Sequence, residues 1–118
     1  MYTISKEYHF SASHILYGLP EDHQCSRLHG HNYVVEVELQ SEDLDTNGFV
    51  RDYHELDTLK RYIDDKIDHR HLNDVLGKNN TTAEQLAKHF YDWCKERWPE
   101  VSAVRVNETP KTSAEYRA

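Results

Sequence analysis

The amino-acid sequence predicts an α+β fold, in which an antiparallel sheet carries two helices on one face. Two segments, 2–11 and 29–40, alternate apolar and polar residues, which is typical of strands with one buried face. Two later segments, 52–67 and 81–98, place apolar residues three or four apart, the spacing of an amphipathic helix. Strands and helices form separate blocks along the chain, and this grouping favours an antiparallel sheet.

The first strand is predicted over residues 2–11, and its apolar face consists of Tyr2, Ile4, Tyr8 and Phe10. A loop follows over residues 15–27, because the periodicity is lost and Gly18 and Pro20 interrupt the chain. The second strand is predicted over residues 29–40, and one of its faces carries His31, Tyr33, Val35, Val37 and Leu39. The polar residues alternate with these, so the strand is expected to be half buried.

Capping residues and apolar stripes predict the helices. A short strand, 49–51, is expected before the first helix, which Asp52 opens with Glu55 as its partner in a capping box. The buried stripe of this helix consists of Leu56, Leu59, Ile63 and Ile67. An irregular segment rich in His, Asn and Asp is expected over residues 68–80.

A second capping box, Thr81 with Glu84, is predicted to begin the next helix, which Pro99 ends. The inner face of this helix consists of Leu86, Phe90, Cys94 and Trp98. The chain then closes with two expected strands, residues 101–109 and 114–117. The predicted order is therefore three strands, two helices and a strand, with the short strand 114–117 as a possible addition at the end.

Length and composition limit the classes of function. The 118 residues are enough for one domain, 1–118. The net charge of -7 argues against a nucleic-acid partner, because such domains usually carry a basic face. No apolar run approaches the roughly 20 residues that cross a bilayer, so no membrane partner is expected. The first residues lack the apolar core of a secretory signal, and the two cysteines cannot form a disulfide framework, so we expect a cytoplasmic protein.

Nine histidines are many for this length, and three of them have the spacing of metal ligands. His29 and His31 are two residues apart on a predicted strand, so both imidazoles point to the same face. Gly30 between them leaves the opposite face open to close approach. His14 ends the first strand, where an antiparallel neighbour could bring it within reach. Three nitrogen ligands with no obvious fourth are typical of an open, catalytic zinc site, although such a histidine pair also occurs by chance on solvated strand ends.

Three further residues are candidates for chemistry. Cys25 lies four residues before His29, where a nearby dication would favour its thiolate. The alternative is that Cys25 is itself a fourth ligand, which would make the site closed and structural. Asp68 precedes His69, and a carboxylate beside an imidazole can orient it and stabilise its protonated form, although a polar helix end would have the same sequence. His71 is close enough to compete with His69 for this role.

Glu108 shares a predicted strand face with the apolar residues Val104 and Val106. A buried carboxylate needs a partner. One suitable partner is a planar ligand edge with two adjacent N–H donors, since a carboxylate accepts two parallel hydrogen bonds well. The alternative is that Glu108 lies at an exposed strand end.

Together these residues resemble the 6-pyruvoyl-tetrahydropterin synthase family over nearly the whole chain. The matching stretches are, in order, Phe10–His14, Cys25–Tyr33, Gly48–Tyr53, Asp68–His69, Thr81–Glu84 and Val106–Thr109. The Cys-x-x-x-His-Gly-His core, with an upstream histidine and a late Glu-Thr, is specific to this family. The compact length is most similar to the bacterial branch, 6-carboxy-5,6,7,8-tetrahydropterin synthase, which serves queuosine and other deazapurine synthesis.

The resemblance implies the tunnelling fold (T-fold), a four-stranded antiparallel sheet with two helices on one face. Subunits of this family assemble into a trimeric barrel, and two trimers stack as a homohexamer with sites at the subunit interfaces. The resemblance implies zinc as cofactor, and it assigns residues as follows: zinc ligands His14, His29 and His31; catalytic Cys25, Asp68 and His69; pterin-binding Glu108, Thr81 and Thr82. Asp68 and His69 are expected to serve the zinc of a neighbouring subunit.

The implied reaction converts 7,8-dihydroneopterin triphosphate to 6-carboxytetrahydropterin, acetaldehyde and triphosphate. Zinc would bind oxygens of the substrate's side chain as a Lewis acid, Cys25 would take a proton, and His69 would move a second one. Two alternatives remain: the branch that makes 6-pyruvoyltetrahydropterin, and a non-enzymatic zinc-binding assembly module. The triphosphate requires local positive charge in an acidic chain, and the candidates nearest to the matching motifs are Lys6, Arg27 and Arg51.

Overall fold

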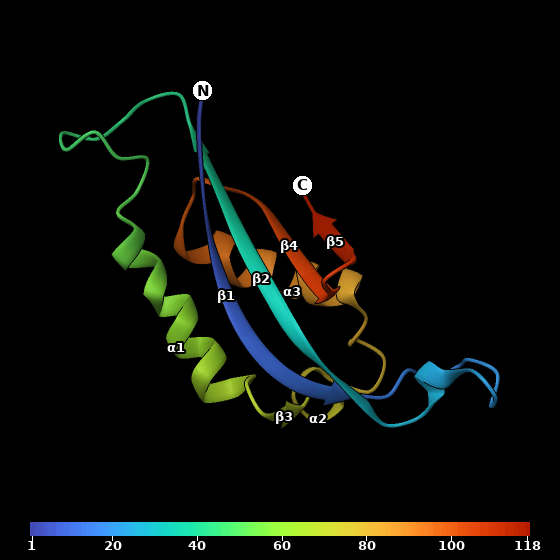
Figure 1. Ribbon diagram of the computed structural model, residues 1–118. Helices are drawn as coiled ribbons and strands as arrows, with labels where there is room; N and C mark the ends of the chain where they lie inside the picture. The colour runs from blue at the N-terminus through green and yellow to red at the C-terminus, as the bar shows by residue number, and fades with distance from the viewer.

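The computed structural model describes residues 1–118, and its centre is a twisted sheet (Figure 1). Strands β1 (Tyr2–His14) and β2 (His29–Ser41) are the longest and pair antiparallel along their whole length. Strand β4 (Val101–Thr109) pairs antiparallel with β2, and β5 (Thr112–Tyr116) pairs antiparallel with β4. The strands expected at both ends of the chain are therefore present.

The sheet has five strands and is mixed, whereas the family resemblance implied four antiparallel strands. The extra strand, β3 (Arg70–His71), pairs parallel with Ala12 and Ser13 at the edge of β1, and the order is β3-β1-β2-β4-β5. Helix α2 (Leu72–Leu76) follows directly, so the segment 68–80 is not irregular throughout. A strand of two residues is too short to show an alternating pattern, and only its contact with β1 defines it.

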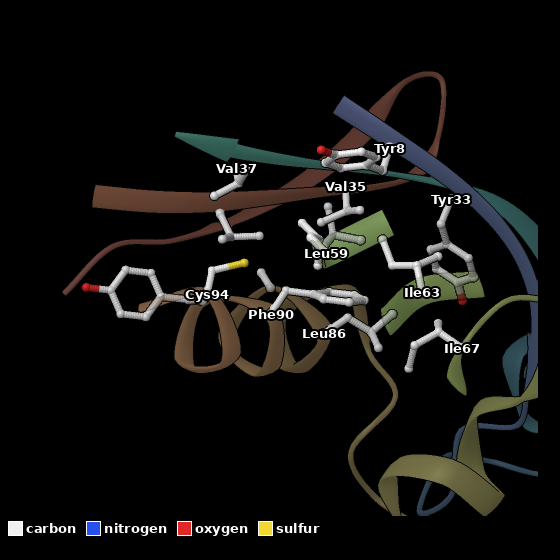
Figure 2. Packing of buried hydrophobic residues seen from close by; sticks show 14 of the residues in the cluster. Tyr8, Tyr33, Val35, Val37, Leu59, Ile63, Ile67, Leu86, Phe90 and Cys94 are labelled. Atoms are coloured by element: carbon white, nitrogen blue, oxygen red, sulfur yellow. The ribbon is translucent and has the colours of Figure 1, made fainter. Parts of the chain in front are cut away.

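Helices α1 (Asp57–Lys66) and α3 (Ala83–Arg97) cover the same face of the sheet, and Figure 2 shows their side chains meeting those of β1 and β2. The predicted apolar stripes are confirmed. The first helix stripe is at most 1% exposed, and it consists of Leu56, Leu59, Ile63 and Ile67. The inner face of α3 is at most 5% exposed, and it consists of Leu86, Phe90, Cys94 and Trp98. The core therefore lies between one sheet face and two helices.

The start of the first helix differs from its prediction. Asp52 does cap a turn, since its carboxylate accepts a hydrogen bond of 2.9 Å from the backbone N–H of His54. The turn is a 3₁₀ helix, η2 (Tyr53–Leu56), which precedes α1. Glu55 does not close a capping box, because its carboxylate accepts a hydrogen bond from Arg51 at 2.5 Å.

The start of α3 lies one residue later than predicted. The Thr82 hydroxyl accepts a hydrogen bond from the backbone N–H of Gln85 at 3.2 Å, and Gln85 Oε1 accepts one from the Thr82 N–H at 3.1 Å. The capping box is therefore Thr82 with Gln85, and the predicted box of Thr81 with Glu84 is wrong. Thr81 is buried, its carbonyl accepts a hydrogen bond from His14, and its hydroxyl makes no hydrogen bond to the helix backbone.

The predicted short strand 49–51 is also wrong. The carboxylate of Asp45 accepts hydrogen bonds from the backbone N–H groups of Asn47 and Phe49, at 2.8 and 2.9 Å, and these bonds hold the segment in a turn. Arg51 then bonds Glu100, which ties this loop to the start of β4. The segment 49–51 is therefore part of a loop, and the side chains of Asp45 and Arg51 hold this loop in place.

The molecule is elongated. Its extents are 55 × 25 × 24 Å and its radius of gyration is 15.4 Å, against about 13.5 Å for a compact domain of this length. The long β1–β2 hairpin causes this shape, and the loop between these strands projects from the body (Figure 1). None of the helices combines the length and the hydropathy that a membrane-spanning segment requires.

Candidate functional site

Pairing of β1 with β2 brings three histidines together at one end of the sheet. His14, the last residue of β1, lies opposite His29, the first residue of β2, and Ala12 lies opposite His31. The ligand nitrogens of the three imidazoles all lie within 4.8 Å of one another. The residues that the sequence proposed as metal ligands therefore form one cluster, which we name the three-histidine cluster.

Hydrogen bonds fix the tautomers of two of these histidines. His14 donates from Nδ1 to the carbonyl of Thr81 at 2.8 Å, and His29 donates from Nδ1 to the carbonyl of Arg27 at 2.7 Å. In the neutral rings both Nε2 atoms therefore carry lone pairs. These two Nε2 atoms face each other at 2.9 Å. Two facing lone pairs repel unless a cation lies at the centre, so this arrangement fits a bound metal ion.

Burial keeps two of the imidazoles in the form that binds metal. His14 is fully buried, and burial lowers its pKa, although the hydrogen bond to Thr81 opposes this effect. Burial also lowers the pKa of His31, whose Nε2 is buried without a hydrogen-bond partner. An orphaned buried nitrogen is costly, and a metal ion would satisfy it. The cluster can therefore hold a divalent metal through three neutral nitrogens.

Glu108 lies beside the three-histidine cluster. Its Oε1 is 3.7 Å from His31 Nε2, its Oε2 is 3.9 Å from His14 Nε2, and its side chain is 26% exposed. The pairing of β4 with β5 shifts register between Asn107 and Thr109, so Glu108 lies in a β-bulge. Bulges often redirect a side chain next to a functional site. Glu108 is thus neither packed in the core nor free at an exposed strand end.

Asp68 and His69 form an ion-pair contact at the edge of β1. His69 Nδ1 is 2.9 Å from Asp68 Oδ2, and the other carboxylate oxygen of Asp68 accepts the backbone N–H of Ser11 at 2.9 Å. This backbone bond is the main reason that the pKa of Asp68 is lowered. His69 has a left-handed backbone with φ of 59°, which is rare outside glycine and occurs often at functional sites. The competing His71 instead contacts the Ser13 hydroxyl through Nδ1 at 3.0 Å.

The His69 imidazole is 81% exposed and lines an open cavity of about 450 Å³ together with His31, Arg70 and His71. The cavity lies against the ends of β1 and β2, on the edge where β3 pairs. The His69 imidazole is therefore accessible from the surface at this edge of the sheet.

Cys25 lies in a 3₁₀ turn, η1 (Gln24–Ser26), within the projecting loop. Its thiol is half-buried and is not part of the three-histidine cluster. No hydrogen bond joins Cys25 to Asp68 or His69; its own backbone carbonyl accepts the N–H of Leu16 at 2.9 Å. The structure therefore brings the metal-ligand candidates together, whereas no hydrogen bond links Cys25 to the Asp68–His69 pair.

Thr81 and Thr82 lie where β1 meets the start of α3. Thr81 is 1% exposed, and its hydroxyl has no hydrogen-bond partner, while its carbonyl holds His14. Both threonines line a smaller cavity of about 290 Å³ with Lys78 and Tyr17. Thr82 is already engaged as the cap of α3, so Thr81 is the threonine with unused hydrogen-bonding capacity.

Two of the three proposed phosphate-binding cations are already neutralised. Lys6 Nζ is 2.9 Å from Asp57 Oδ1, and Arg51 is 2.8 Å from Glu100 Oε1. Arg27 has no carboxylate partner and lies next to the cluster, since its carbonyl accepts the hydrogen bond of His29. Of these three, only Arg27 retains a free positive charge near the site.

The comparison with known protein families agrees with this geometry. The family model described as 6-pyruvoyl tetrahydropterin synthase matches residues 3–118. The chain belongs to the 6-pyruvoyl tetrahydropterin synthase family. Two relatives are named 6-carboxy-5,6,7,8-tetrahydropterin synthase: one from Haemophilus influenzae, 33% identical with 99% of each chain covered, and one from Synechocystis sp., 34% identical with 98% of this chain and 93% of the relative covered.

A solved structure of this family has the same fold. The 6-pyruvoyl tetrahydropterin synthase of Caenorhabditis elegans superposes with a TM-score of 0.87 at 28% identity, covering 99% of this chain and 95% of that one. This chain therefore has the same overall fold as that enzyme.

Sequence reasoning missed the groups that hold the histidines. The carbonyls of Thr81 and Arg27 orient His14 and His29, and such partners commonly tune metal ligands. Backbone carbonyls carry no side-chain signal, so no sequence pattern could have revealed them. Tyr33 was assigned only to the core, yet its fully buried hydroxyl has no partner and its ring lies 5.5 Å from that of His31.

Proposed function

We propose that this chain is a zinc-dependent 6-carboxy-5,6,7,8-tetrahydropterin synthase. It converts 7,8-dihydroneopterin triphosphate and water to 6-carboxy-5,6,7,8-tetrahydropterin, acetaldehyde and triphosphate, a step in queuosine and other deazapurine synthesis. One observation supports this most: the facing, unprotonated Nε2 atoms of His14 and His29, in a chain whose bacterial relatives carry this name. Both cysteines are free thiols, which suits a reducing cytoplasm.

Zinc is the proposed metal, with His14, His29 and His31 as its ligands. When bound by three protein ligands, zinc acts as a Lewis acid toward oxygens of the substrate. The ligands are preorganised for metal binding. Backbone carbonyls hold the His14 and His29 rings in one tautomer, and burial lowers the pKa of His14 and His31, which favours their neutral form.

Cys25 and the Asp68–His69 pair are the proposed proton-transfer groups. The Cys25 thiolate takes a C–H proton from the substrate's side chain, and His69 moves a second proton during rearrangement and loss of triphosphate. The hydrogen bond from the Ser11 N–H lowers the pKa of Asp68, so its carboxylate is ionised and can orient the His69 imidazole, whose Nδ1 lies 2.9 Å from Asp68 Oδ2. No external reductant is required, because the electron shift is internal to the substrate.

Glu108 is the proposed anchor of the pterin, because a carboxylate can accept two parallel hydrogen bonds from the amino-pyrimidine edge. No lysine or arginine pairs with this carboxylate, which leaves it available. Thr81 and Thr82 are proposed to contribute to the same pocket, and the unpartnered Thr81 hydroxyl supports this assignment.

The proposed assembly is a homohexamer of two trimers, with the active site shared between copies. Three features support it. No hydrogen bond joins Cys25 to Asp68 or His69 of its own chain, no helix covers the second face of the sheet, and β5 has an unpaired outer edge (Figure 1). A second copy could supply the missing proton-transfer group to each three-histidine cluster.

Incubation with 7,8-dihydroneopterin triphosphate tests the function. We expect acetaldehyde and the 6-carboxypterin in equal amounts, in a reaction that stops after treatment with a zinc chelator and resumes on adding zinc. The likeness to the C. elegans enzyme supports a second candidate, formation of 6-pyruvoyltetrahydropterin. That reaction releases triphosphate but no acetaldehyde, so triphosphate without acetaldehyde would overturn the first proposal.

Replacing Cys25 separates an enzyme from a zinc-binding assembly module. We expect Cys25→Ala to retain zinc and to lose about 10²–10⁴-fold in turnover, the range for a general base. Cys94→Ala is the control for loss of a thiol, because Cys94 is buried in the core. If Cys25→Ala lost zinc and folding stability together, the thiol would be a structural ligand.

A further inference from the structure

Glu108 has no partner in the structure other than the three-histidine cluster. Its two carboxylate oxygens approach the Nε2 atoms of His31 and His14 at 3.7 and 3.9 Å, too far for hydrogen bonds. No lysine, arginine or backbone N–H bonds this carboxylate. A partly buried carboxylate without a cation is unfavourable, so a positive charge is expected between Glu108 and the imidazoles.

The spacing of these atoms suits coordination of one ion. Two ligand atoms of a tetrahedral zinc site with bonds near 2.1 Å are about 3.4 Å apart. The carboxylate oxygens exceed this separation by only a few tenths of an ångström. The bulge between Asn107 and Thr109 directs Glu108 toward this side of the cluster.

We infer that Glu108 is a fourth, displaceable ligand of the metal held by His14, His29 and His31 when no substrate is bound. This inference deepens the proposed function and rests on it, because the same carboxylate is the proposed anchor of the pterin. The pterin ring separates its amino-pyrimidine edge from the side chain that would reach the metal. Glu108 therefore cannot hold the far edge of the pterin from its present position, and it must leave the cluster when the substrate enters.

Metal affinity tests the ligand role without relying on turnover. The probe is Co²⁺, whose visible absorption reports the number of ligands. We expect Glu108→Gln to raise the Co²⁺ Kd about tenfold or more and to weaken the intense band of four-coordinate cobalt. Glu7→Gln makes the same chemical change at an exposed residue of β1 and should alter neither property. If Glu108→Gln fails to fold, Glu108→Asp, which shortens the same carboxylate, replaces it.

Unsubstituted pterin tests displacement, since it has the amino-pyrimidine edge but no side chain to reach the metal. In the Co²⁺-loaded wild-type protein, pterin should remove the carboxylate and change the cobalt band, whereas the band of Glu108→Gln should not respond. A Glu108→Gln protein with wild-type Co²⁺ affinity and spectrum would overturn the inference, even if acetaldehyde is formed. Absence of acetaldehyde with weakened Co²⁺ binding would instead reject the proposed reaction and leave the ligand role standing.

Discussion

At the scale of single residues, the site depends on how each imidazole is held. His14 and His29 each donate a hydrogen bond from Nδ1 to a backbone carbonyl, and this bond orients the ring so that Nε2 points to the centre of the cluster. The two Nε2 lone pairs are 2.9 Å apart and repel each other unless a cation lies between them. Binding of a metal relieves this repulsion, which couples metal binding to stability.

Replacing one imidazole should remove the coupling between metal binding and folding stability. We expect His29→Ala to lose zinc more severely than the 10–100-fold typical of an outer-shell change, because a direct ligand is removed. Zinc per subunit after dialysis against a weak chelator measures this, and the melting temperature should no longer rise on adding zinc. His9→Ala is the control, since His9 is exposed on the same strand pair. Full zinc content in His29→Ala would contradict the ligand assignment.

At the scale of elements, the position of α3 fixes the site, because Thr81 contacts His14 immediately before the helix begins. The capping box of Thr82 with Gln85 sets this start. A shift of the helix by one residue would move the Thr81 carbonyl away from the histidine.

Removal of this cap should therefore be measurable. We expect Thr82→Ala to lower the free energy of unfolding by about 1 kcal/mol, the typical loss for an N-cap. Urea unfolding measures this change. Glu84→Gln, at the position that the sequence wrongly placed in the box, should change it by much less. Equal losses in the two variants would contradict the observed capping box.

The contact between α1 and α3 contains a pH-sensitive pair. The Tyr62 hydroxyl and His89 Nε2 are 2.7 Å apart, and burial lowers the pKa of His89, although Asp92 opposes this. The unfolded chain takes up a proton near the ordinary pKa of about 6.5, whereas the folded chain resists it. The stabilising effect of neutral His89 is therefore complete above that pH and is lost as the pH falls toward the lowered pKa.

We expect the free energy of unfolding to fall between pH 8 and pH 5, and to fall less in His89→Gln than in the wild type. All measurements are made with chelator, so that metal loading is equal. His54→Gln is the control, because the His54 side chain is 91% exposed. A pH dependence in His89→Gln as steep as in the wild type would show that His89 does not contribute.

At the scale of the whole molecule, one face of the sheet and the outer edge of β5 are left uncovered. The radius of gyration is 15.4 Å, which is large for a compact domain of this length, and helices cover only one face of the sheet. The other sheet face lacks the second layer against which sheets usually pack. Closing such sheets against one another would remove their edges.

A shared active site predicts complementation between inactive variants. Cys25→Ala and His69→Ala should each be inactive alone, whereas oligomers assembled from a mixture of both should recover part of the activity. Such mixtures contain sites that combine an intact Cys25 from one copy with an intact His69 from another. Light scattering checks that mixed oligomers form, and inactive mixed oligomers would place the whole site within one subunit.

The sequence by itself determined the long strands, the helix stripes and the stretches that show the family, because periodic burial and residue spacing are local properties of the chain. It could not determine β3, which exists only through its pairing with β1. It also misplaced the cap of α3 and the turn at 49–51, because several neighbouring residues could make these local hydrogen bonds and the pattern does not show which of them do.

For the site, the sequence identified three histidines, and only the β1–β2 register brought their nitrogens within 4.8 Å. The tertiary structure alone decided which nitrogen of His14 and His29 faces the centre, because backbone carbonyls that no pattern reveals accept their Nδ1 protons. It also placed Glu108 at the open side of the cluster, through a bulge that arises from mismatched pairing of β4 and β5.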